Sequence, residues 1–303
     1  MDLSSSMNSR FSAWGKLMLF GEYLVLRGAK SMAFPLNVGQ HLEVIPHADG
    51  ETLWQSFEGD TCWLEIRFSK ELEIISTNDE KKANVIQELL KLIQSNNPAV
   101  EIIGKNFKVT TDFNRAYGFG TSSTLIALLS QWSGQDSYDL LAHSFGGSGY
   151  DVATSLSRQA IVYTVENRME KQFVLSAKVT DHLLFVYLGQ KQDSAKEVAS
   201  FKNKEVSPED LVRINEIIDA AVSCSAIEEW EDLMNESEAM VANILEVSTV
   251  QNRLFSDYPY AVKSLGAWGG DFVMASFRNE AEARKYFQEK GLTDMFNYQE
   301  LTQ

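Results

Sequence analysis

Residues 117–124 (YGFGTSST) combine glycines with hydroxyl side chains and lead directly into the apolar stretch 125–129 (LIALL). Glycines allow the backbone to turn tightly and to approach a ligand closely. The start of a helix offers free N–H groups and a partial positive charge to phosphate, and Ser or Thr hydroxyls there can bind Mg²⁺. Taken alone, such a cluster is usually a loop in which a Ser or Thr caps the helix. It is not a Walker loop, because no Gly-Lys-Ser/Thr follows.

Two further glycine clusters and one lysine are also candidates for chemistry. Residues 146–151 (GGSGYD) place Asp151 after a flexible loop, where a carboxylate can act as a general base or bind a metal. The simpler explanation is a turn in which Asp151 caps a helix at 152–156. Residues 266–271 (GAWGGD) precede an apolar strand and alone indicate a hairpin turn. Lys16 precedes another apolar strand, where a single lysine is usually a solvated charge.

Strands and helices in both halves of the chain must position these segments. Residues 81–94 carry apolar side chains every three or four positions, which predicts an amphipathic helix. Residues 121–132 are mostly apolar all round and predict a buried helix, and Ser207-Pro208 predicts the start of another. Other strands are expected at 41–45, 62–68, 107–111, 160–166, 182–188 and 272–277, and other helices at 227–245 and 280–290. This mixture without regular alternation indicates an α+β fold, with a boundary near residues 173–181.

Composition and charge narrow the function classes. The chain has 303 residues and a mass of 34.1 kDa, enough for two ordinary domains or one large one. Its 44% hydrophobic and 23% charged residues are a globular balance, which excludes a disordered chain. The formal charge of −15 repels nucleic acid and anionic membranes, so we expect no nucleic acid and no membrane as partners. It also repels phosphorylated substrates, for which Arg115, Lys191 and Lys196 are candidate local cations.

The spacing of cysteines and histidines excludes a disulfide framework, a thiolate metal site and a zinc site. Cys62 and Cys224 lie far apart without a Cys-x-x-Cys pair, and we expect both thiols to be buried and reduced. The four histidines show no ligand spacing. No apolar run approaches the ~20 residues of a membrane span, and the polar, Ser-rich residues 1–10 do not resemble a signal peptide. The sequence therefore predicts a cytoplasmic protein.

Four segments, in order, resemble the GHMP kinases, the superfamily of galactokinase, homoserine kinase, mevalonate kinase and phosphomevalonate kinase. Residues 15–23 (GKLMLFGEY) resemble the family's Pro-Gly-Lys…Gly-Glu-His/Tyr segment, and residues 118–123 (GFGTSS) resemble its phosphate-binding Gly-Leu-Gly-Ser-Ser-Ala loop. Residues 148–151 (SGYD) resemble the Ser-Gly-x-Asp segment that carries the catalytic aspartate, and residues 266–271 resemble the Gly-Ala-Gly-Gly-Gly-Asp loop. The details are closer to phosphomevalonate kinase than to mevalonate kinase, and residues 149–153 (GYDVA) are similar to the Gly-Tyr-Asp-Ile-Ala motif of a group of bacterial kinases.

The resemblance implies a two-domain α+β fold, with an N-terminal ATP-loop domain over residues 1–177 and a C-terminal ferredoxin-like domain over residues 178–303. It implies ATP and Mg²⁺ as cofactors and a small-molecule substrate as the partner. Asp151 would accept the acceptor's proton, and Lys16 would stabilise charge at Asp151 and on the transferred phosphoryl group. The resemblance assigns triphosphate binding to Gly118, Gly120, Thr121, Ser122 and Ser123, with Ser122 also the Mg²⁺ ligand, and substrate binding to Glu22, Tyr23, Ser148, Gly149, Gly269 and Gly270.

The resemblance favours phosphomevalonate as the acceptor, then mevalonate. Alternatives are another sugar or amino-alcohol kinase, a diphosphomevalonate decarboxylase, and a non-catalytic ligand sensor on the same fold. Three positions depart from the family pattern: Trp14 replaces a proline, Trp268 replaces a glycine, and Leu140, beside Asp139, stands where mevalonate kinases have a Mg²⁺-binding glutamate. Mg²⁺ would then rest on Ser122 and ATP alone, or on Asp139. The sequence carries no signature for or against a homodimer.

Overall fold

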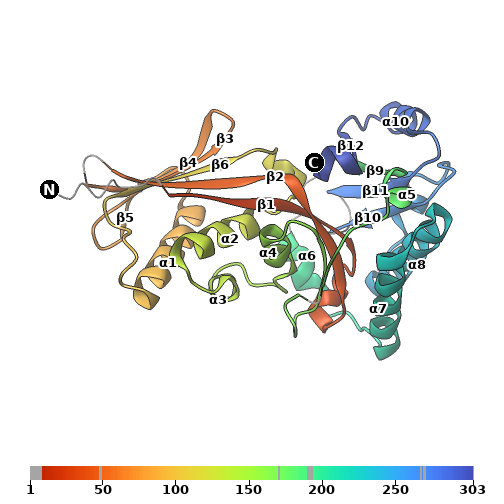
Figure 1. The fold of residues 1–303 in the computed structure, drawn as a ribbon, viewed down its shortest axis with the longest axis horizontal. Coiled ribbons are helices and arrows are strands. Elements are labelled where there is room, and N and C mark those ends of the chain that lie inside the picture. The colour runs from red at the N-terminus through yellow and green to blue at the C-terminus, as the bar shows by residue number, and fades with distance from the viewer. Residues whose placement is uncertain are drawn as a thin grey trace. The chain divides into compact units, whose positions relative to one another are not determined.

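The computed structural model describes residues 9–47, 50–169, 171–189, 194–266, 268 and 271–302. These residues form two compact units (Figure 1). The first unit contains the described residues up to Gly15 with residues 38–115 and 120–156, and the second contains residues 16–37, 116–119 and the described residues from 157 onward. β1 (Ser9–Phe20) and β2 (Ser31–Pro46) each run from one unit into the other, so the units interleave in the sequence. The assignment of residues 1–177 and 178–303 to two family domains stays a prediction.

The first unit is built on a sheet with the strand order β5-β4-β3-β6-β2. Its further strands are β3 (Thr52–Glu58), β4 (Thr61–Phe68), β5 (Ile74–Thr77) and β6 (Lys105–Thr111). β3 and β6 are parallel, and the other neighbours on this path are antiparallel. The helices of this unit are α1 (Glu80–Asn96), α2 (Thr121–Ser133), α3 (Ser137–Ala142) and α4 (Tyr150–Leu156). α1 and α2 lie on one face of the sheet (Figure 1), over a core in which Trp54 stacks on Phe107.

α1 forms where the sequence spaces apolar side chains for a helix. The side chain of Asp79 caps it by accepting a hydrogen bond from the backbone N–H of Lys82. The buried face consists of Ala83, Ile86, Leu89, Leu90 and Ile93. The helices predicted at 81–94 and 121–132 are therefore confirmed, and the strands predicted at 41–45, 62–68 and 107–111 fall within β2, β4 and β6. The sequence analysis does not predict β3 or β5.

The second unit contains a four-stranded sheet in the order β10-β11-β9-β12. Its strands are β9 (Leu183–Tyr187), β10 (Val262–Leu265), β11 (Phe272–Ser276) and β12 (Met295–Asn297), and every neighbouring pair is antiparallel. Helices separate β9 from β10, and α10 (Glu280–Glu289) separates β11 from β12. This β-α-β-β-α-β order with its strand arrangement is ferredoxin-like. The predicted α+β class and ferredoxin-like sheet are confirmed.

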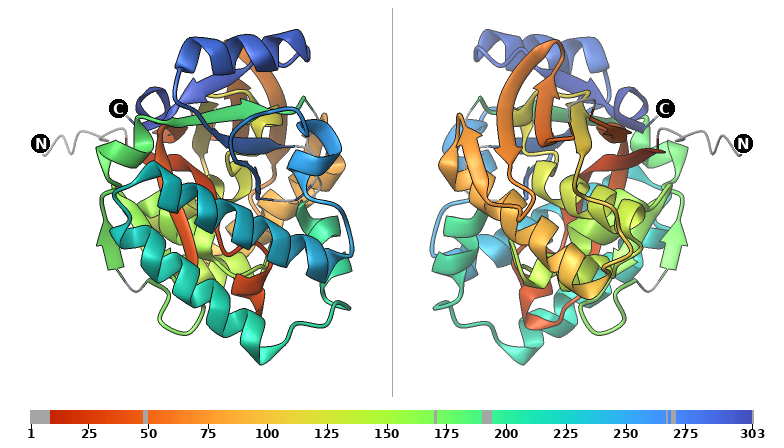
Figure 2. Two further views of the ribbon diagram at one scale, coloured as in Figure 1. Left: turned by 90° about the vertical axis from the view of Figure 1, so that its right-hand side faces the viewer. Right: turned by 90° about the vertical axis from the view of Figure 1, so that its left-hand side faces the viewer.

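The other elements of the second unit surround this sheet or extend β2. β7 (Ala160–Tyr163) pairs with the N-terminal end of β2 and with β8 (Lys171–Phe173). The helices are η1 (Leu24–Arg27), α5 (Ala177–Thr180), α6 (Ser194–Phe201), α7 (Pro208–Ser223), α8 (Ile227–Leu245), α9 (Val250–Leu254) and α11 (Tyr298–Thr302). α7 begins as predicted, with a reciprocal capping box between Ser207 and Asp210. α7 and α8 lie side by side (Figure 2), and α8 packs against β10.

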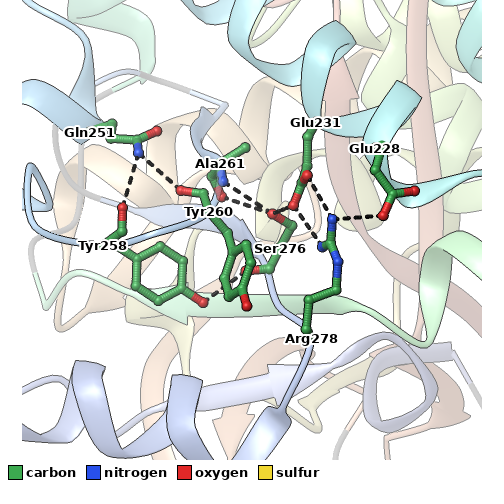
Figure 3. Close-up of polar contacts among 8 residues, drawn as sticks. All are labelled: Glu228, Glu231, Gln251, Tyr258, Tyr260, Ala261, Ser276 and Arg278. Atoms are coloured by element: carbon green, nitrogen blue, oxygen red, sulfur yellow. Dashed lines mark hydrogen bonds and ion pairs between the residues drawn. The ribbon is translucent and has the colours of Figure 1, made fainter.

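A polar network fixes the first turns of α8 to the end of β11 (Figure 3). The guanidinium of Arg278 donates to Glu231 at 2.8 Å and to Glu228 at 3.0 Å. The hydroxyl of Ser276 donates to Glu231 at 2.6 Å. The side chain of Gln251 on α9 donates to the backbone carbonyl of Tyr260 at 2.9 Å. α8 and α9 are thus anchored on the strands that lead to and from residues 266–271.

The cysteines differ in part from expectation. Cys224 is buried, but Cys62 is exposed, so the prediction that both thiols are buried is wrong for Cys62. Cys62 pairs with Phe57 just after the irregularity in the β3–β4 ladder, near the turn between these strands, where fewer neighbours cover a side chain. Within the described part of the chain, no helix is both long enough and apolar enough to cross a membrane.

Candidate functional site

The glycine loop ahead of α2 has a backbone that only glycine adopts easily. Gly118 and Gly120 have φ angles of +70° and +96°, in the left-handed region. A Cβ atom on Gly118 would lie 2.7 Å from a carboxylate oxygen of Asp271. The backbone of the loop therefore comes very close to a carboxylate, and residue 118 has no room for a side chain as the structure stands.

The N-terminus of α2 has no side-chain cap. Gly120 is the N-cap residue and has no side chain to accept a hydrogen bond from the first turn. The hydroxyl of Ser123 donates instead to the carbonyl of Gly120 at 2.8 Å, and the hydroxyl oxygen of Thr124 lies 3.0 Å from the same carbonyl. The alternative of a Ser or Thr cap is therefore wrong for this loop. Because the first N–H groups of a helix have no partner within the helix, the start of α2 keeps its donors and its positive dipole end for an anion.

The three hydroxyl residues of the loop differ in exposure. Ser122 is exposed, Thr121 is half-buried, and Ser123 is buried. The hydroxyl of Ser155 donates to that of Ser123 at 3.4 Å. The exposed hydroxyl of Ser122 is therefore better placed than that of Ser123 to bind Mg²⁺. Within the described residues, no group of three or more His, Cys, Asp or Glu side chains could hold a metal ion.

A buried polar chain fixes the start of α2 on the sheet. The hydroxyl of Thr124 donates to the side-chain oxygen of Gln40 at 2.7 Å, and the amide of Gln40 donates to the hydroxyl of Thr111 at 2.9 Å. All three side chains are buried. The sequence analysis misses this chain, because its members come from β2, β6 and α2 and carry no local signal.

Asp151 lies in the first turn of α4, in the first unit. It is half-buried, and one of its carboxylate oxygens accepts a hydrogen bond from the N–H of Val152 at 3.0 Å. α4 packs against α2, and the hydroxyl of Ser155 donates to the carbonyl of Asp151 at 2.8 Å as well as to Ser123. The structure thus places the helix of Asp151 against the helix that follows the glycine loop. Ser148 and Gly149 lie just before α4, half-buried and buried.

Lys16, in the second unit, is attached to the glycine loop. Its backbone N–H donates to the carbonyl of Phe119 at 2.9 Å, and its ammonium group donates to the carbonyl of Gly118 at 3.4 Å. Two hydrogen bonds therefore hold this half-buried lysine beside a segment that lies 102 residues later in the sequence. A cation beside such a loop strengthens anion binding.

Glu22 and Tyr23 form a strained and buried segment of the second unit. Tyr23 has a φ angle of +61°, which is uncommon for a residue with a side chain. Glu22 is 1% exposed and forms an ion pair with Lys263, which is 0% exposed. The hydroxyl of Tyr23 accepts a hydrogen bond from the backbone N–H of Trp268 at 3.0 Å, and burial raises the pKa of Tyr23 to about 12.

Comparisons with known proteins identify the fold. No protein-family model matches the sequence, and no curated protein matches it either. A mevalonate kinase from Methanococcus jannaschii has 17% identity, a TM-score of 0.70 and coverage of 97% of this chain and 98% of its own. A Streptococcus pneumoniae phosphomevalonate kinase bound to phosphomevalonate and AMPPNP has 15% identity, a TM-score of 0.69 and coverage of 95% and 99%. A Lactococcus lactis galactokinase bound to galactose has 12% identity, a TM-score of 0.71 and coverage of 97% and 93%.

The chain has the fold of the GHMP kinases. The resemblance seen in the four sequence segments is thus confirmed at the level of the fold, over nearly the whole chain.

Some of the residues that the sequence predicts to bind ligands lie outside the residues that the structure describes. Gly269 and Gly270 lie outside the described residues, as do Lys191 and the side chain of Lys196. Arg115 lies within them and pairs with Glu58 at 2.9 Å while stacking on Trp63 at 3.8 Å. Its charge is therefore already partly compensated, which makes it a weaker candidate for binding an anion.

The structure also shows functional candidates that the sequence analysis misses. Lys263 and Glu238 are fully buried charged residues of the second unit. Residues 262–265 (VKSL) alternate between polar and apolar types only in part, so the sequence gives no clear signal that Lys263 is buried, and its need for a partner follows from the structure.

Proposed function

We propose that this protein is an ATP- and Mg²⁺-dependent kinase that phosphorylates a small molecule. One observation carries the proposal: Lys16 is hydrogen-bonded to a loop of left-handed glycines that leads into the uncapped N-terminus of α2. Backbone donors, a helix dipole and a cation then act on the same short segment, as triphosphate binding requires. The GHMP kinase fold supports this interpretation.

In this proposal each residue has one task. Gly118 and Gly120 let the backbone surround the triphosphate, and the N–H groups of residues 121–123 donate to its oxygens. Bound ATP supplies the phosphoryl group, and Mg²⁺ shields its charge. Asp151 orients the acceptor hydroxyl and takes its proton as the new oxygen–phosphorus bond forms and ADP leaves. Lys16 stabilises the charge on the transferred group, and the sequence resemblance implies that it also favours the ionised form of Asp151.

For the acceptor, the sequence resemblance favours phosphomevalonate, then mevalonate. A Streptococcus pneumoniae phosphomevalonate kinase with the same fold was solved with phosphomevalonate, whereas the Lactococcus lactis galactokinase was solved with galactose. A sugar or amino-alcohol acceptor is therefore the second candidate. If the acceptor oxygen belongs to a phosphate monoester, it is already ionised near neutral pH, and Lys16 then matters more than Asp151.

The test is an ADP-release assay with ATP, Mg²⁺ and a panel of mevalonate, phosphomevalonate, diphosphomevalonate, galactose and homoserine. We expect turnover with one acceptor, a loss of about 10²–10⁴-fold in kcat for Asp151→Asn with a hydroxyl acceptor, and about 10²–10³-fold for Lys16→Met. Lys285→Met, at a surface ion pair with both side chains largely exposed, is the matched control and should retain activity.

Other outcomes point to other functions. Phosphate release from diphosphomevalonate would identify a decarboxylase. ATP binding without turnover of any acceptor, with Asp151→Asn binding ATP as well as the wild type does, would contradict the kinase and favour a ligand sensor.

A further inference from the structure

Three charged side chains are buried together beneath the segments that carry Tyr23 and Trp268. Glu22, Lys263 and Glu238 are 1%, 0% and 2% exposed. Charged groups are rarely buried to this degree unless they are paired, because water solvates them strongly. Such a cluster therefore needs an explanation in function or in conformational specificity.

Lys263 compensates the charge of Glu22. Its ammonium group donates to one carboxylate oxygen of Glu22 and to the carbonyl of Ser264 at 2.9 Å, and it lies 5.4 Å from the centre of the Phe20 ring. The second carboxylate oxygen of Glu22 is buried and has no hydrogen-bond partner among the described residues. Lys263 is thus the main favourable contact of this carboxylate.

Glu238 contacts β10, the strand that carries Lys263, at the next residue. One of its oxygens accepts hydrogen bonds from the N–H of Val250 at 2.9 Å and from the hydroxyl of Ser264 at 3.1 Å, and the other accepts from the N–H of Ser264 at 2.9 Å. Glu238 belongs to α8, whose first turns are anchored by Glu228 and Glu231 (Figure 3). β10 is therefore fixed at two consecutive residues just before the loop that contains Trp268.

Residues 21–23, which contain the Glu22 side of this ion pair, have strained backbone at Tyr23. Gly21 has a φ angle of +93°, which glycine adopts without strain, and a Cβ atom there would lie 2.4 Å from the carbonyl of Lys30, so a larger residue would not fit. Tyr23 also has a positive φ, and its hydroxyl accepts the hydrogen bond from the N–H of Trp268. Strained backbone persists only where its surroundings impose it, and it concentrates at functional sites. The contacts of Glu22 and Tyr23 provide that restraint.

We propose that Lys263 and Glu238 are positioning residues for acceptor binding: Lys263 holds residues 21–23 through the carboxylate of Glu22, and Glu238 holds β10, the strand that leads to Trp268. The proposal rests on the proposed kinase function. In it, Glu22 is an internal anchor rather than a direct ligand of the acceptor. Burial, as the largest influence, raises the pKa of Glu22, which is consistent with a group removed from solvent.

The test compares Lys263→Met, Glu22→Met, the double variant and the surface control Lys285→Met. We expect Lys263→Met to raise the KM of the acceptor by about tenfold or more while the KM of ATP stays within about twofold, because only the acceptor side is displaced. The double variant replaces both charges by apolar side chains of similar size, so it should recover most of the loss. Glu238→Gln provides a second variant of unchanged shape, with the same expected rise in acceptor KM, in case Lys263→Met does not fold.

Two results would overturn the proposal. An unchanged acceptor KM in both Lys263→Met and Glu238→Gln would show that neither residue positions the site. A double variant as impaired as Glu22→Met alone would show that Glu22 contacts the acceptor directly.

Amide hydrogen exchange separates this proposal from the proposed function. Exchange of residues 21–23 and 262–266 should be faster in Lys263→Met than in the wild type and should slow again in the double variant. If it does so while the wild type turns over no acceptor, the kinase proposal fails and the restraint of these segments stands. Equal exchange in the wild type, Lys263→Met and the double variant would contradict the restraint, whatever the activity.

Discussion

Gly118→Ala and Gly134→Ala form a matched pair that tests the glycine loop. The two glycines have φ angles of +70° and +71°, so an alanine meets the same backbone strain at both positions. At Gly134, after the last turn of α2, an added Cβ atom meets no atom within 4 Å. At Gly118 it would lie 2.7 Å from a carboxylate oxygen of Asp271 and 2.9 Å from the carbon that bears it. The pair therefore isolates the effect of close approach.

The expected magnitudes follow from these contacts. Left-handed backbone costs a residue with a side chain about 1–2 kcal/mol, and this is the whole loss expected for Gly134→Ala. Gly118→Ala carries the same cost, and the overlap with Asp271 adds about 1–3 kcal/mol unless the carboxylate rotates away. Since Asp271 is partly exposed, rotation would reduce the added cost but would move a charge beside the loop.

The measurements are urea unfolding and calorimetric titration with ATP and Mg²⁺. Both variants should lose stability, Gly118→Ala more than Gly134→Ala, and only Gly118→Ala should lose ATP affinity, by about tenfold or more, because a misplaced donor set binds the triphosphate poorly. Equal losses of stability together with wild-type ATP affinity in both variants would refute the close packing of the loop and its role in phosphate binding.

Three further predictions concern single side chains. Ser122→Ala should raise the Mg²⁺ concentration for half-maximal activity by about tenfold, whereas Ser123→Ala, at a buried hydroxyl, should leave it unchanged in the same titration. Thr124→Val removes the donor to Gln40 and should lower the free energy of unfolding by about 1–3 kcal/mol, measured in urea. Arg213 lowers the pKa of Glu236 from its ordinary 4.5, so their pair stabilises the fold above that pH and ceases to do so as pH falls through the lowered value. Arg213→Met should therefore lower the free energy of unfolding slightly at pH 7, since both side chains are well exposed, and not at all in strong acid. A loss independent of pH, measured in urea at both pH values, would contradict the assignment.

Local signals account for what the sequence predicts correctly. α1 is visible in the spacing of its apolar residues, and α7 in Ser207 and Pro208. β3 is not predicted, because Leu53 and Trp54 are consecutive buried residues that break the alternation of a strand. β3 also depends on parallel pairing with β6, some fifty residues away, which no local pattern reveals.

In the candidate site, too, some residues can be found from local sequence signals and others only from the structure. The glycines and Asp151 are visible because backbone conformation and helix starts have short-range signatures. The ion pair of Glu22 and Lys263 joins residues 241 positions apart, and the chain Thr124–Gln40–Thr111 joins three elements, so both follow only from tertiary packing. Sequence therefore indicates which backbone segments could bind a ligand, and the structure adds the side chains that hold those segments in place.

Because the chain is acidic, anion binding at the glycine loop depends on the groups that provide a local positive potential. A formal charge of −15 opposes a bound triphosphate, and the guanidinium of Arg115 is already paired with Glu58. In the described part of the glycine loop, the favourable field then comes from the N-terminus of α2 and from the ammonium group of Lys16 at Gly118. A helix dipole and one lysine are modest against four negative charges, because a helix end contributes only about half an elementary charge. On the proposed function, Mg²⁺ would supply most of the remaining compensation, and ATP affinity should fall more steeply on removal of Mg²⁺ than on Lys16→Met.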